Sequence, residues 1–193
     1  MRETSVRTNE DSSDVLGWYD ELSSVYDELY GEEQSRKYTY VLKEFSLRDY
    51  LVNRKHVILD LGCGTGNLIK FLRKKFPSKF IYYVGLDLSP SMCLLSKKRV
   101  DNVGLLGDIV GGDVFRLPFR NEVANSVFSI TVLTCRDSLK EVVTNFRELL
   151  RDNGLLYYTI LCSDFSKTQE HGFELCEVSK PLSEREVLCV IKS

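Results

Sequence analysis

The segment that most constrains the fold runs from residue 57 to residue 67 and reads VILDLGCGTGN. Its first five residues are apolar except for Asp60, as is typical of a parallel strand that is covered on both faces. Glycines then fall at every second position, namely Gly62, Gly64 and Gly66. Further apolar residues recur at helical spacing: Leu68, Leu72 and Phe76. The segment predicts a strand, a glycine-rich turn and a helix, which form a ligand-binding corner in open α/β sheets.

The order of acid and glycines indicates which ligand this corner takes. A dinucleotide fingerprint would place its third glycine at position 67, where the chain has Asn67. The chain has an acid at the strand end instead, and the Asp60 carboxylate would repel a phosphate and attract a cation. S-adenosylmethionine carries an ammonium and a sulfonium and no phosphate. The pattern therefore favours this cofactor, and a nicotinamide-dependent oxidoreductase stays open as an alternative.

The same residues resemble the first motif of the class I S-adenosylmethionine-dependent methyltransferases. The resemblance implies an α/β fold of the Rossmann-like type, with S-adenosyl-L-methionine as the cofactor. It further implies a three-layer sandwich around a seven-stranded, mostly parallel sheet in the order 3-2-1-4-5-7-6, with an antiparallel final hairpin. We assign residues 14–193 to this domain and residues 1–13 to a disordered tail.

Two further acids match the family's pattern. Asp87 ends a predicted strand over residues 80–87, where a carboxylate can accept two hydrogen bonds from a ribose diol. Asp113 lies in a segment, residues 112–119, that resembles the family's third motif, whose acid accepts from the adenine amino group; Asp108 offers a second register. The predicted cofactor-binding residues are Tyr26, Asp60, Gly62, Cys63, Gly64, Gly66, Asp87, Leu88, Met92, Gly112, Asp113, Val114 and Thr131.

Helices over residues 14–46 are predicted to form a lid. Apolar residues up to Leu29 share one helical face, and Gly31 interrupts the run as a candidate hinge before a second helix. The segment repeats Tyr-Asp, and in many small methyltransferases a tyrosine of such a segment reaches over the methionine part of the cofactor. Tyr26 is the first candidate for that role, followed by Tyr19 and Tyr30.

Strand and helix continue to alternate toward the end of the chain. After the strand over residues 80–87, Ser89 is predicted to cap a helix that has Pro90 at its first position. A strand over residues 125–134 is followed by a helix that Asp137 or Ser138 caps and that Asn153-Gly154 ends. A strand over residues 155–162 and a hairpin of residues 173–180 and 185–192, turning at residues 181–184, complete the sheet. The six cysteines show no zinc-binding spacing, so no metal site is predicted. The hairpin would place Cys176 opposite Cys189; free thiols are expected there, and a disulfide stays open as the alternative.

Composition limits the classes of function. Lys and Arg total 26 against 28 Asp and Glu, so the chain lacks the basic excess usual in nucleic-acid binders. No run of about 18 apolar residues is present, and residues 1–14 lack the apolar core of a signal peptide. We therefore expect one domain in a soluble, cytoplasmic protein.

The sequence does not identify the methyl acceptor or a catalytic side chain. Methyl transfer depends chiefly on alignment, so a missing catalytic motif does not argue against an enzyme. Residues 134–137 lack the N-P-P-Y and Pro-Cys motifs of related enzymes, and Cys135 is interpreted as part of the wall. The chain is similar to quinone-biosynthesis enzymes and to wobble-uridine tRNA methyltransferases, which work with a small zinc-binding activator. The alternatives are therefore an RNA methyltransferase with such an activator and a non-catalytic cofactor-binding subunit.

A partner protein is also predicted. In the implied strand order, residues 105–110 form an edge strand that is apolar apart from Asp108 and has no lysine or proline to prevent pairing. Such an edge can accept a strand from another protein. A small activator is hypothesised to bind there.

Overall fold

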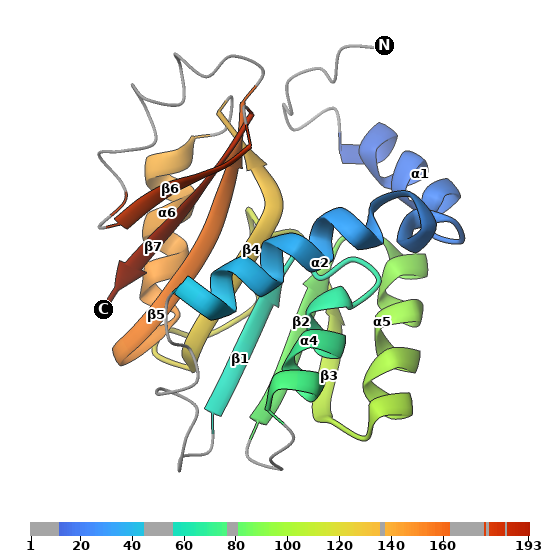
Figure 1. Ribbon diagram of the computed structural model, residues 1–193, viewed down its shortest axis with the longest axis horizontal. Coiled ribbons are helices and arrows are strands. Elements are labelled where there is room, and N and C mark those ends of the chain that lie inside the picture. The colour runs from blue at the N-terminus through green and yellow to red at the C-terminus, as the bar shows by residue number, and fades with distance from the viewer. Residues whose placement is uncertain are drawn as a thin grey trace.

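The computed structural model describes residues 12–44, 56–76, 81–135, 138–162, 176, 178–183 and 185–193. Seven strands form one sheet in the order β3-β2-β1-β4-β5-β7-β6, which confirms the predicted topology (Figure 1). β7 is antiparallel to both of its neighbours, and the other pairs are parallel. The strands are β1 (His56–Leu61), β2 (Ile81–Asp87), β3 (Leu106–Gly111), β4 (Ala124–Thr134), β5 (Leu150–Leu161), β6 (Val178–Ser183) and β7 (Glu186–Lys192). The helices are α1 (Ser12–Leu22), α2 (Tyr26–Glu44), α4 (Asn67–Lys75), α5 (Pro90–Val103) and α6 (Leu139–Glu148).

Two apolar layers hold the helices on opposite faces of the sheet. Ile58 of β1 joins a cluster with buried residues of α2, α4 and α5, whereas its neighbour Leu59 joins a second cluster with α6. This division follows from the alternation of side chains along a strand. Among the described residues, no helix is long and apolar enough to cross a membrane.

The N-terminal helices differ from the prediction. A turn at residues 23–25 separates α1 from α2. Helix α2 then runs without interruption through Gly31, so the predicted hinge at Gly31 is wrong. One glycine costs an α-helix only about 1 kcal/mol, which tertiary contacts can offset. Leu29 is 60% exposed, whereas Tyr38 and Val41 lie in the core. α1 begins at Ser12, two residues inside the predicted tail; residues 1–11 lie outside the described residues.

The helix boundaries near the cofactor corner were predicted more accurately than those of α6. Ser89 caps α5 by accepting a hydrogen bond from the Met92 amide at 3.2 Å, as predicted. α6 ends at Glu148 rather than at Asn153-Gly154, because Leu149 and Leu150 are buried and β5 starts at once. Asn153 has φ 60°, and the β4–β5 register shifts nearby. Ser138 precedes α6 without a side-chain cap bond, and Asp137 lies outside the described residues.

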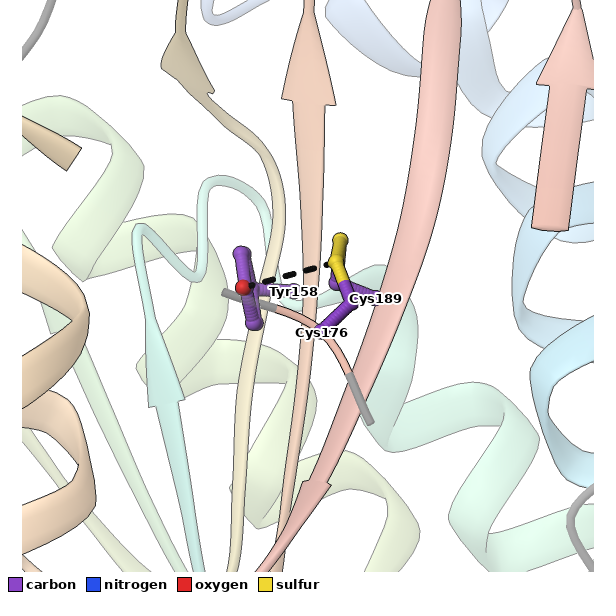
Figure 2. The surroundings of a disulfide bond; sticks show 3 residues. All are labelled: Tyr158, Cys176 and Cys189. Atoms are coloured by element: carbon purple, nitrogen blue, oxygen red, sulfur yellow. Dashed lines mark hydrogen bonds between the residues drawn. A yellow bond between two sulfur atoms is a disulfide. The ribbon is translucent and has the colours of Figure 1, made fainter. Parts of the chain in front are cut away.

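A disulfide joins β7 of the C-terminal hairpin to a residue that precedes β6. Cys176 and Cys189 are joined, with their Cα atoms 5.2 Å apart, so the expectation of free thiols at these two positions was wrong (Figure 2). The Tyr158 hydroxyl lies 3.7 Å from the Cys176 sulfur. Residues 181–183, predicted as part of the turn, belong to β6, an edge strand in which a proline is tolerated. Residues 173–175 lie outside the described residues.

Candidate cofactor site

A cavity opens at the carboxyl ends of β1, β2 and β4. This is where the strand order reverses, which is the usual ligand position in an open α/β sheet. The residues that line it are Tyr19, Tyr26, Gly62, Gly64, Asp87, Leu88, Ser89, Met92, Gly112, Asp113, Val114, Ile130, Thr131 and Val132.

The glycine turn forms the floor of this cavity. Gly62 and Gly64 have φ of 78° and 53°, a left-handed conformation that side chains rarely adopt. A Cβ at Gly62 would collide with Val132, and one at Gly64 would enter open space in the cavity. The turn therefore leaves a side-chain-free cradle against which a ligand can lie.

Asp87 lines the cavity and also holds the glycine turn. Its Oδ2 accepts a hydrogen bond from the Gly64 amide at 2.7 Å, and its Oδ1 accepts one from the Ser89 amide at 3.0 Å. The acid at the end of β2 is thus oriented by backbone amides from the two turns beside it. Asp113 lies in the same cavity, whereas Asp108 is on β3, where it accepts a hydrogen bond from Tyr82.

Asp60 does not occupy the position that was predicted for it. It is buried beneath the turn, and its Oδ2 accepts a hydrogen bond from the Tyr83 hydroxyl at 2.6 Å. Burial raises the pKa of Asp60 to about 7, against the lowering effect of the Tyr83 hydrogen bond. In this structure the Asp60 carboxyl group does not line the cavity, where it was predicted to lie. Cys63 and Gly66 also lie outside the cavity lining, and the other predicted residues are part of it.

Sequence reasoning missed Ser89, Ile130 and Val132 as lining residues and ranked Tyr19 second to Tyr26. Ser89 was recognised only as a helix cap, although its place directly after the Asp87 turn was a usable signal. Ile130 and Val132 carried no signal, because regular strand alternation would place them on the face opposite to Thr131.

Residues 59–158 match the family described as Methyltransferase domain, and this match covers more than half of the chain. The chain belongs to the methyltransferase-domain family. Its cofactor is S-adenosyl-L-methionine, and the side-chain-free cradle and the acids of the cavity fit that molecule.

This methyltransferase domain is similar in sequence or in fold to three further proteins. An uncharacterized protein of Methanocaldococcus jannaschii is 27% identical over 148 residues, or 76% of this chain and 51% of that protein. A malonyl-[acyl-carrier protein] O-methyltransferase of Xylella fastidiosa is 34% identical over 118 residues, 61% of this chain and 38% of that protein. The domain thus spans about half the length of these relatives, or less. A chain from the complex of the Haloferax volcanii Trm112 methyltransferase activator has the same fold, with a TM-score of 0.65 and 15% identity over 89% of this chain and 96% of that one.

Both Tyr-Asp pairs of the methyltransferase domain contact the cofactor corner. Tyr19 and Tyr26 line the cavity, while Tyr30 packs on Tyr26 outside the lining. Asp20 accepts hydrogen bonds from the Ser89 hydroxyl and the Ser91 amide. These contacts hold the C-terminal part of α1 against the start of α5.

The second aspartate, Asp27, binds the glycine turn. It accepts hydrogen bonds from the Thr65 hydroxyl at 2.6 Å and from Arg99 at 2.5 Å. Although partial burial acts in the opposite direction, hydrogen bonds from Thr65 and Arg99 lower the pKa of Asp27 to about 2. The carboxylate is therefore ionised at neutral pH and ties α2 to the turn.

Proposed function

We propose that this methyltransferase domain transfers the methyl group of S-adenosylmethionine to an acceptor by in-line displacement. The observation that carries the proposal is the cavity itself, in which Asp87 and Asp113 stand at the β2 and β3 end and Thr131 at the β4 end. Asp87 would hold the ribose diol and Asp113 the adenine amino group. The glycine cradle would then support the methionine part, and the methyl group would point toward β4.

The chemistry supplied by the cofactor is an activated methyl group, whose bond to sulfur breaks as the bond to the acceptor forms, leaving a neutral thioether. Because that leaving group needs no proton, the protein accelerates the step by holding the two reactants in line. No side chain is assigned as a catalytic acid or base. The acceptor would approach over the carboxyl ends of β4 and β5.

Titration calorimetry tests the cofactor part of this proposal. The purified chain should bind S-adenosylmethionine and S-adenosylhomocysteine and should not bind NAD. Incubation of the chain with radiolabelled S-adenosylmethionine and a native cell extract should then label an acceptor. Binding without any labelling, with co-purified proteins added, would favour a non-catalytic cofactor-binding subunit.

The N-terminal helices are proposed to close over the bound cofactor, because Tyr19 and Tyr26 already form part of the cavity wall. We expect amide hydrogen exchange in residues 15–32 to slow about tenfold when S-adenosylmethionine is added, since local opening becomes less favourable. Helix α6, on the opposite face of the sheet, is the internal control and should be unaffected. Equal protection of residues 15–32 with and without cofactor would contradict the lid.

The edge of the sheet is proposed to bind a small activator protein. β3 pairs only with β2 among the described strands, so its second edge is open to pairing (Figure 1). Leu106 of β3 is 63% exposed, and Tyr82 beside it is 42% exposed. The Haloferax volcanii complex, in which a chain of this fold is found with a methyltransferase activator, supports the same idea. The chain itself has no basic excess, so an RNA acceptor would require a partner of this kind to supply contacts to the RNA.

A charge on the exposed side of β3 should weaken this association. A substitution at Ile109 would disturb the core, because the Ile109 side chain packs there against Gly85. The exposed Leu106 is therefore the position to change, and the informative substitution is Leu106→Lys. We expect it to reduce the recovery of a co-purifying protein from the native cell about tenfold, because strand addition buries the side chains along the edge. Leu94→Lys on α5, where Leu94 is 70% exposed, is the matched control. Equal recovery with both variants would exclude β3 as the docking edge.

A further inference from the structure

Strand β4 is irregular where it forms the cavity wall. Its register with β5 shifts between Ser129 and Leu133, and Thr131 has φ 62°, which is rare for a β-branched residue. Because of this bulge, the three consecutive residues Ile130, Thr131 and Val132 all line the cavity. A regular strand would present only alternate residues to one face. The bulge thus gives the wall a shape that a regular strand cannot.

Three buried side chains from distant parts of the chain converge on the Thr131 hydroxyl. Its Oγ1 accepts hydrogen bonds from Gln34 Nε2 at 3.1 Å and Lys37 Nζ at 2.9 Å, and donates one to Glu186 Oε1 at 3.1 Å. Lys37 Nζ also lies 2.6 Å from Glu186 Oε2, and the two side chains are 7% and 2% exposed. Gln34, Lys37, Thr131 and Glu186 are called the Thr131 cluster below.

The cluster is not explained by fold stability alone. Burial of a lysine and a glutamate costs several kcal/mol in desolvation, and apolar residues of similar volume often serve as well. A residue in a sparsely populated conformation costs about 1–3 kcal/mol and persists only where its surroundings impose it. Here the surroundings are the buried ion pair of Lys37 and Glu186. Within the part of the chain that the structure describes, Gln34 Oε1 is buried and has no hydrogen-bond partner, so the cluster is not fully satisfied either.

The position of the bulge indicates what it contacts. Val132 packs against Gly62 of the cofactor cradle, and Thr131 lies at the end of the cavity remote from Asp87 and Asp113. If those two acids hold the ribose and the adenine, as proposed above, the methyl-bearing sulfur lies next to the bulge. We propose that Lys37 and Glu186 are positioning residues that act through Thr131. They fix the wall that meets the methyl group, and so let the site distinguish S-adenosylmethionine from S-adenosylhomocysteine.

The experiment compares the dissociation constants of these two ligands, measured by calorimetry, for the wild-type chain and four variants. Thr131→Val removes the Thr131–Glu186 contact, and Glu186→Gln removes the charge that pairs with Lys37, each at nearly constant volume. We expect both to reduce the preference for S-adenosylmethionine about fivefold, the scale of the net contribution of one hydrogen bond. Thr131→Ser keeps the hydroxyl and should retain the wild-type ratio. Arg36→Met, which removes an exposed ion pair with Glu32 on the same helix, is the control.

The ratio separates positioning from a purely structural role. If the cluster only stabilises the fold, its loss should lower the melting temperature and weaken the binding of both ligands equally. That result would overturn the inference. It would also be overturned if both single variants kept the wild-type ratio. A wild-type chain that binds neither ligand would refute the proposed function itself, which is a different outcome. If Glu186→Gln fails to fold, Thr131→Val still decides the question, because it leaves the buried ion pair in place.

Discussion

Replacement of Asp87 by alanine should weaken S-adenosylmethionine binding about a hundredfold. The variant would lose two charge-assisted hydrogen bonds to the ribose, each of which contributes roughly 1.5 kcal/mol. The carboxylate has a second role that increases the effect. It orients the Gly64 and Ser89 amides, so its removal also loosens the cradle on which the methionine part would lie. Titration calorimetry with the purified variant measures the change directly.

Asp108→Ala is a suitable control for Asp87→Ala. Asp108 is also an acid on a strand of the sheet, but its side chain contacts Tyr82 of β2 and does not line the cavity. It should leave the affinity within about twofold of wild type, since surface substitutions away from a site have small effects. Similar losses in the two variants would show that the cavity is not the cofactor site.

The residues whose place at the cavity could be predicted are those that the local sequence positions. Gly62 and Gly64 follow a buried strand, and Asp87 ends the next one, so spacing alone places them at the same edge of the sheet. These positions need only short-range geometry and the general rules of parallel sheets. The strand order, by contrast, was predicted from the resemblance to the methyltransferase family, and the structure confirms it.

The features that escaped prediction depend on contacts between distant residues. Lys37 meets Thr131 across 94 positions, and Thr131 meets Glu186 across 55, with nothing in the local sequence to indicate either contact. The end of α6 and the course of α2 through Gly31 were set by packing, which overrides local helix signals. The disulfide also depends on more than strand pairing, because Cys189 pairs with Ser179 in the hairpin and Cys176 precedes β6.

Asp60 shows how burial can reverse an interpretation based on charge. The sequence predicts a carboxylate that attracts a cation, but burial raises the pKa of Asp60 to about 7, well above its ordinary value of 3.8. Between these two values the folded chain holds a proton that the unfolded chain releases, so stability falls as the pH rises through this range. Below about pH 4 both states are protonated, and above the folded pKa the contribution is lost.

Asp60→Asn should therefore remove a pH dependence rather than a ligand contact. From pH 5 to pH 8 the wild-type chain should lose about 3 kcal/mol of unfolding free energy that the variant retains. Asparagine keeps an acceptor oxygen for the Tyr83 hydroxyl and carries no charge. Urea unfolding at both pH values measures the difference, with Asp101→Asn on the exposed side of α5 as the control. An equal loss of stability in the wild type and in Asp60→Asn would show that Asp60 is ionised over this whole pH range. A large drop in the S-adenosylmethionine affinity of Asp60→Asn at pH 8, relative to the wild type, would show that Asp60 belongs to the cofactor site.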